Sequence, residues 1–144
     1  MHRRPLSRGR RLAVIGALVV AVACLLPWYT IGGEASGIPA RSVNAFAGLA
    51  GLLVFLAALG VPALVSLPYA SGDRPVSVDR WPAYLLLLAI AVGGVALTIL
   101  SIVAGDLLIE GFRPDRAPGV WLALVGLVVL ARATFEVWEE PVAR

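Results

Sequence analysis

The sequence predicts an all-α membrane protein, with four transmembrane helices in an antiparallel bundle and both termini in the cytoplasm. The chain has 144 residues, of which 60% are hydrophobic and only 15% are charged, whereas charged residues make up about a quarter of soluble domains. Its apolar residues fall into four stretches, separated by shorter polar segments. The basic residues gather beside particular ends of these stretches, as membrane topology signals do.

The first stretch is part of a single transmembrane domain, residues 1–144, since the chain is too short for a second. Residues 1–11 hold Arg3, Arg4, Arg8, Arg10 and Arg11 and are expected to form a basic cytoplasmic tail. The span covers about residues 12–29, a run of roughly 18 non-ionisable residues that can cross the bilayer core. Trp28 and Tyr29 close it at the depth where aromatic belts form.

Cys24 opens a second interpretation of this first stretch. A basic start, an apolar run and Ala21-Val22-Ala23 before Cys24 resemble a signal peptide with a loose lipoprotein box. However, Ala21 stands where lipoboxes favour leucine, and the residues after Cys24 are apolar rather than a polar tether. We therefore expect an uncleaved span in which Cys24 is a small packing residue, and processing at Cys24 stays open.

The second span is predicted over about residues 45–67, after a turn-rich outer loop at residues 30–44. Ala47 and Gly51 have the small-xxx-small spacing that lets helix backbones approach each other. Pro62 removes one helical hydrogen bond and is expected to kink this span.

The third span is predicted over about residues 83–104, after an inner loop at residues 68–82. Gly93 and Gly94 lie near its centre. Thr98 carries one of its few hydroxyl groups, which we expect to bond back to its own helix.

The fourth span covers about residues 118–136, after an outer loop at residues 105–117. Its uncharged part, residues 118–131, would extend only about 21 Å at 1.5 Å per residue, against a core of about 30 Å. The helix must therefore continue past Arg132, which is expected to extend its side chain to the inner interface. Pairing of Arg132 with Glu136 is a further option.

The distribution of arginine predicts the orientation. With four spans and a cytoplasmic N-terminus, nine arginines lie inside, at positions 3, 4, 8, 10, 11, 74, 80, 132 and 144. Three lie outside, at positions 41, 113 and 116. This excess satisfies the positive-inside rule. The absence of lysine, together with abundant alanine and glycine, is typical of a GC-rich bacterial genome, so we expect a bacterial plasma membrane.

The two outer loops and the adjoining helix ends define a candidate outer contact surface. Its residues are Trp28, Tyr29, Glu34, Arg41, Asp106, Arg113 and Arg116. An offset of 75 positions aligns Pro39-x-Arg41 with Pro114-x-Arg116, and Gly51 with Gly126. If this is a repeat, the two halves are related about an axis along the membrane normal, and whether it is real stays open.

Several chemistries are disfavoured by the residues that are missing. The only histidine is His2 in the tail, and the only cysteine is Cys24, so no catalytic histidine, haem ligand, zinc site or disulfide is expected within the spans. No Asp or Glu lies inside the first three spans, whereas proton-coupled transporters need an ionisable group there. We expect no enzyme activity, no cofactor, no metal and no nucleic-acid partner.

One local pattern carries a resemblance. Leu26-Pro27-Trp28-Tyr29, followed by Asn44-Ala45-Phe46, resembles small four-span membrane proteins of actinobacteria, in which a Leu-Pro-Trp-aromatic end to the first helix recurs. The resemblance covers about a quarter of the chain. It implies a four-span fold and, since that group has no assigned activity, no functional residue.

These features favour a non-enzymatic accessory or scaffold subunit that packs against the lipid bilayer and against another membrane protein or itself. The candidate helix-packing residues are Ala47, Gly51, Pro62, Gly93, Gly94 and Thr98. The alternative is a transport element for a small ligand or lipid, with a cavity between the kinked second helix and the glycine-rich third helix.

Overall fold

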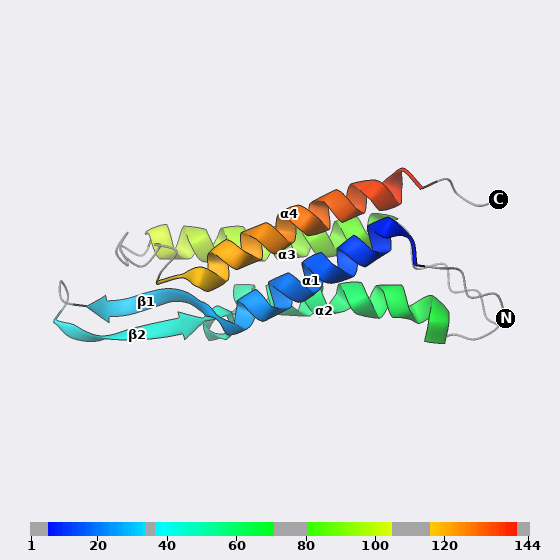
Figure 1. The fold of residues 1–144 in the computed structure, drawn as a ribbon. Helices are drawn as coiled ribbons and strands as arrows, with labels where there is room; N and C mark the ends of the chain where they lie inside the picture. The colour runs from blue at the N-terminus through cyan, green and yellow to red at the C-terminus, as the bar shows by residue number, and fades with distance from the viewer. Residues whose placement is uncertain (1–5, 34–36, 71–80, 105–115, 141–144) are drawn as a thin grey trace.

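A computed structural model describes residues 6–33, 37–70, 81–104 and 116–140. Within them lie four long helices: α1 (Arg8–Leu25), α2 (Leu49–Ala70), α3 (Trp81–Ala104) and α4 (Pro118–Trp138). The helices run alternately in opposite directions, so the start of α1 and the end of α4 lie at the same end of the molecule, called the termini end below (Figure 1). The predicted, mostly helical fold is therefore confirmed for this part of the chain.

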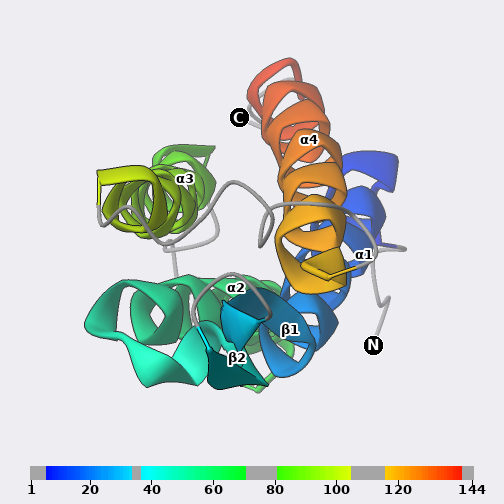
Figure 2. The same ribbon diagram turned by 90° about the vertical axis from the view of Figure 1, so that its left-hand side faces the viewer.

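The helices form a closed ring in sequence order. α1 packs against α2 and α4, and α3 packs against the same two helices from the other side (Figure 2). Buried side chains form two clusters along this ring. One lies toward the end opposite the termini and contains Trp28 and Val54. The other lies toward the termini and contains Tyr84 and Leu130.

Three of the helices in the described residues are long and apolar enough to cross a membrane: Leu49–Pro68 within α2, Trp81–Ala104 and Pro118–Trp138. α1 differs because Arg8, Arg10 and Arg11 occupy its first turn. Its apolar part, residues 12–25, is thus limited to about 21 Å at 1.5 Å per residue. The uncharged part of α4 has the same length.

The prediction of an all-α chain is wrong between the first two helices. The region expected to be an outer loop forms an antiparallel hairpin of β1 (Pro27–Gly33) and β2 (Ile38–Asn44), with Thr30 opposite Ser42. Gly32 and Gly37, on either side of the connection, have positive φ angles of 84° and 66°, which glycine adopts without steric cost. The hairpin extends beyond the helices at the end opposite the termini (Figure 1).

The boundaries of the spans shift accordingly. The first helix ends at Leu25 rather than continuing to residue 29, because Pro27 cannot donate the next helical hydrogen bond. A short 3₁₀ helix, η1 (Ala45–Ala47), precedes α2. Asn44 caps η1 by accepting a hydrogen bond from the N–H of Phe46 at 3.2 Å. The second helix therefore begins at Leu49, not at residue 45.

The most extensive contact in the described residues joins α1 to α4, the first and last helices. Buried residues, most of them glycine or alanine, recur on both helices at alternating spacings of four and three, the repeat of an antiparallel coiled coil. A Cβ added at Gly16 would lie 2.9 Å from the backbone N of Leu130, and one at Gly126 would lie 2.7 Å from Val20 Cγ2. Because glycine has no side chain, the two backbones approach within van der Waals contact.

Candidate functional site

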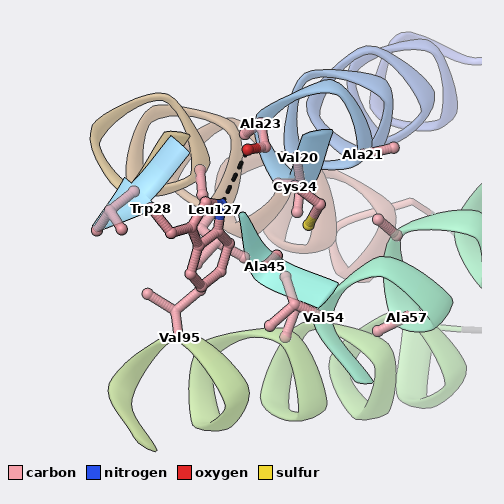
Figure 3. Close-up of a cluster of buried hydrophobic side chains, with 14 residues drawn as sticks. Val20, Ala21, Ala23, Cys24, Trp28, Ala45, Val54, Ala57, Val95 and Leu127 are labelled. Atoms are coloured by element: carbon pink, nitrogen blue, oxygen red, sulfur yellow. Dashed lines mark hydrogen bonds between the residues drawn. The ribbon is translucent and has the colours of Figure 1, made fainter. Parts of the chain in front are cut away.

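The end of α1 is organised by Trp28. Its side chain has 0% of its surface exposed, and its indole N–H donates a hydrogen bond to the carbonyl of Ala23 at 2.9 Å (Figure 3). In a continuing helix that carbonyl would accept from residue 27, but Pro27 has no N–H. The carbonyl of Ala23 accepts instead from the backbone N–H of Leu26 at 3.2 Å and from the indole, so Trp28 adds a second donor where the helix ends.

Trp28 also joins α1 to the start of α4. A Cβ added at Gly119 would lie 2.5 Å from Trp28 Cδ1, 2.7 Å from the carbonyl of Ala23 and 2.8 Å from that of Pro27. The indole packs in the core with Leu127 of α4 and Val95 of α3 (Figure 3). Trp28 therefore stabilises the corner between helices, and its predicted place on an outer contact surface is wrong.

The other residues of the predicted outer surface are found in different settings. Tyr29 is half-buried against the core. Arg41 is exposed on β2, opposite Ile31 of β1. Arg116 is exposed just before α4. Glu34, Asp106 and Arg113 lie outside the described residues. The structure thus places one buried residue, one half-buried residue and two exposed arginines in this group.

The first pair of predicted packing residues is not a helix–helix motif. Ala47 is exposed and belongs to η1, so Ala47 and Gly51 do not share one helix. Gly51 is buried, and a Cβ there would collide with the backbone carbonyl of Ala45. Its lack of a side chain lets the start of α2 fold back on η1.

Three of the remaining predicted packing residues lie on α3, where Gly94 contacts α2 and Gly93 faces open space. A Cβ at Gly94 would lie 2.6 Å from Val54 Cγ2 and 2.8 Å from the carbonyl of Ala50, so Gly94 is the point where α2 and α3 meet. A Cβ at Gly93 would meet nothing within 4 Å. Thr98 donates a hydrogen bond to the carbonyl of Gly94 at 2.9 Å, as expected for a hydroxyl bonded to its own helix.

Pro62 lies inside α2, which the structure shows as one helix from Leu49 to Ala70. Its side chain is half-buried. Nearby, a Cβ at Gly60 would lie 3.0 Å from Leu87 Cδ2. This part of α2 is thus packed against α3 through the flexible side chain of a leucine.

Two features are not evident from the sequence pattern as interpreted above. The first is the α1–α4 contact, whose glycines could have been found from their spacing, since Gly9 and Gly16, like Gly119 and Gly126, are seven residues apart. The second is a group of charges at the termini end, where Arg8 and Arg132 both approach the carboxylate of Glu136. The sequence suggests only the Arg132–Glu136 pair, because the contact with Arg8 depends on how α1 and α4 pack.

Within the described residues, no three His, Cys, Asp or Glu side chains are grouped so that they could hold a metal ion. No buried side-chain N or O atom there is without a hydrogen-bond partner. The polar groups of the described interior are thus used in the fold itself. Comparison with protein-family models, curated proteins and solved structures found no match for this chain.

Proposed function

We propose that this chain is a non-enzymatic integral membrane protein of the bacterial plasma membrane that crosses the bilayer four times. The three long apolar helices support membrane insertion. Exposed tryptophans support it too, because Trp121 and Trp138 lie near opposite ends of α4. They are roughly 25 Å apart along the helix at 1.5 Å per residue, a separation that suits two aromatic belts. α1, packed along α4, is the fourth span.

We place both termini in the cytoplasm. In the described chain, Arg8, Arg10 and Arg11 belong to the first turn of α1 and Arg132 to the second half of α4, toward the termini end. Arg41 belongs to β2 and Arg116 precedes α4, at the opposite end (Figure 1). The positive-inside rule puts the richer end in the cytoplasm. The hairpin of β1 and β2 then lies outside, where its backbone can be solvated by water.

In this proposal, the protein acts as an accessory or scaffold subunit, and α3 is the helix that packs against a partner. The observation that carries the proposal is the open space at Gly93, at the centre of the least buried of the three long apolar helices. Ala89 and Ala96 are exposed on the same side of α3, four residues before Gly93 and three residues after it. A shallow surface of this kind admits the backbone of another helix.

The exposed side of α2, which carries several leucines, serves as an internal comparison. It carries Leu49, Leu52, Leu56, Leu59 and Leu67. Branched side chains of this size cover a helix against lipid tails but keep a neighbouring backbone at a distance. α3 exposes large side chains as well, among them Leu86, Leu97 and Leu100. The small run of Ala89, Gly93 and Ala96 is therefore what favours α3 as the docking helix.

The test replaces small residues on α3 and compares them with a matched change on α2. Gly93→Leu and Ala96→Leu fill the proposed docking face, whereas Ala63→Leu adds the same bulk to the exposed side of α2. We expect a membrane protein that co-purifies with the wild type in mild detergent to be lost with the two α3 variants and kept with Ala63→Leu. A photo-crosslinker at position 96 should attach to that same protein. Recovery of a monomer without a partner would contradict the scaffold role.

The transport alternative makes the opposite prediction. It needs Thr98 and Pro62 beside a cavity, but Thr98 already donates to Gly94, and Gly94 is covered by Val54. Thr98→Val and Pro62→Ala are therefore expected to leave function intact under the scaffold proposal. Impaired uptake or export of a small ligand in these variants, with assembly unchanged, would favour transport instead.

A further inference from the structure

At the termini end, one carboxylate is shared by two arginines from different helices. Arg8 Nε of α1 lies 3.9 Å from one oxygen of Glu136, and Arg132 Nε of α4 lies 3.3 Å from the other. The Glu136 side chain is only 16% exposed, whereas those of Arg8 and Arg132 are 86% and 72% exposed. The trio has a net charge of +1, carried by two arginine side chains that are mostly exposed.

The neighbouring ion pair of Arg10 with Glu140 differs from the contacts of Arg8 and Arg132. Arg10 Nη1 lies 2.5 Å from Glu140 Oε2 and 3.1 Å from the hydroxyl of Ser7, and its side chain is only 23% exposed. Arg8 and Arg132 have longer contacts, made through Nε. The terminal N–H groups of Arg8 and Arg132 lie in the plane of the guanidinium, in the geometry that binds two oxygens of one phosphate.

Arg8 stands at the end of an exposed apolar stripe on α1, and Arg132 interrupts such a stripe on α4. On α1, Arg8 and Arg11 are followed on the same side by Ile15, Leu18, Val22 and Leu25, all exposed. On α4, Trp121, Val125 and Val128 lead along one side to Arg132, with Phe135 one turn further. A molecule held at the arginines and lying along these stripes needs an anionic head and long apolar chains.

The lengths of the helices also favour a ligand with an anionic head and long apolar chains. The uncharged stretches of α1 and α4 cover about 21 Å each, whereas α3 alone, with 24 residues, covers about 36 Å. A short apolar face draws the lipid headgroups inward, because the bilayer thins locally to match it. The headgroup level on the α1–α4 side then falls near Arg8, Arg11 and Arg132.

We infer that Arg8 and Arg132, gathered on one side of the α1–α4 pair by Glu136, bind the phosphate of an anionic phospholipid whose acyl chains lie along the exposed stripes of α1 and α4. The inference rests on the membrane placement proposed above and is independent of the scaffold role. It gives the packed α1–α4 pair a lipid-binding face, separate from the open face of α3.

The test measures which lipid stays bound to the purified chain. Wild type, Arg8→Gln/Arg132→Gln and Arg10→Gln are purified in mild detergent and mixed with equal amounts of phosphatidylglycerol and phosphatidylcholine that carry identical acyl chains. Native mass spectrometry counts each bound lipid. We expect wild type to prefer phosphatidylglycerol. Each arginine removed in the double variant should lower this preference roughly fivefold. Arg10→Gln should keep it, since Arg10 is occupied by Glu140.

Two further measurements distinguish the lipid site from a free-phosphate site and from a loss of folding. Excess inorganic phosphate should displace little phosphatidylglycerol, because it lacks acyl chains; full displacement would overturn the inference in favour of a free-phosphate site. Equal binding of the two lipids by wild type would also overturn it, as would an equal loss in Arg10→Gln. The melting temperature of the double variant should stay near that of wild type, and loss of lipid preference through unfolding would count against the site.

Discussion

Trp28 adds a side-chain hydrogen bond at the point where its neighbour Pro27 removes a backbone one. Pro27 ends α1 and leaves the carbonyl of Ala23 without its usual helical donor. The Trp28 indole donates to that carbonyl while filling the corner against Gly119. The dipeptide thus stops the helix and adds a side-chain hydrogen bond to a carbonyl that also accepts from the N–H of Leu26 at 3.2 Å, and a buried hydrogen bond of this kind stabilises the fold modestly.

Trp28→Phe should test this hydrogen bond. Phenylalanine keeps most of the apolar volume but cannot donate to Ala23, so we expect the free energy of unfolding to fall by about 1–2 kcal/mol. Trp138→Phe is the matched control, because that indole is 58% exposed at the far end of α4. Unfolding in detergent, followed by fluorescence or circular dichroism, gives both values. Equal losses in the two variants would argue against a special role for Trp28.

Gly119 should be the most restrictive glycine at this corner. In Gly119→Ala the new methyl group meets both the Trp28 ring and two backbone carbonyls, and backbone atoms cannot turn away. We expect destabilisation of about 1–3 kcal/mol, as for other overpacked sites. Gly48→Ala places a methyl group in open space and should change the melting temperature little. A Gly119→Ala protein as stable as wild type would show that the corner can relax.

At the scale of elements, glycines with similar sequence surroundings have opposite roles. Gly126 closes the contact between α4 and α1, while Gly93 on α3 faces open space. Both lie within apolar helices, directly after a valine. The difference depends on which neighbouring helix packs against them, and this also determines whether a side chain can be added.

Alanine substitution should separate these two glycines. In Gly126→Ala the methyl group would press on Val20 Cγ2 and on the backbone of Gly16, so α1 and α4 must move apart, at a cost of about 1–3 kcal/mol. Gly93→Ala should keep stability unchanged or raise it by up to about 1 kcal/mol, since alanine favours a helix more than glycine does. Thermal unfolding in the same detergent compares them. A reversed order would refute the assigned packing.

The proposed repeat does not extend to these elements. The offset of 75 residues aligns Gly51 with Gly126, but Gly51 contacts the backbone of η1 at Ala45, and Gly126 contacts α1. The two positions therefore serve different contacts.

For the whole molecule, the uneven distribution of charge is the feature with functional consequences. The termini end gathers the arginines of α1 and α4 together with Glu136 and Glu140, and the opposite end carries the hairpin with Arg41 (Figure 1). If the positive-inside rule governs insertion, the hairpin faces away from the cytoplasm.

Single cysteines should establish this orientation. In a Cys24→Ala background, Ser42→Cys places an exposed thiol on β2, and Glu139→Cys places one just after α4. We expect an impermeant maleimide to label Ser42→Cys on intact cells, and Glu139→Cys only after lysis. The opposite pattern would invert the topology, and it would also move the proposed lipid site to the outer leaflet.

The helices could be predicted because hydropathy is a local property. A run of apolar residues tends to become a membrane helix whatever surrounds it, since an unsatisfied backbone is costly in lipid. Pro118 accordingly marks the start of α4, as the sequence indicates, and α3 begins at Trp81, two residues before the predicted start of the third span. The hairpin was missed because residues 27–44 contain many turn-forming residues and only short alternation, so pairing between β1 and β2 outweighed the loop signal.

By itself, the sequence determined the mostly helical class, the three long apolar helices and the gathering of arginine near the chain ends, because these depend on residues that are close together in the chain. Only the tertiary structure decided that Trp28 is buried, that Gly94 is closed and Gly93 open, and that Arg8 and Arg132 share Glu136. Each of these depends on a contact between distant segments. Whether a tryptophan, a glycine or an arginine is exposed is a property of its neighbours in space.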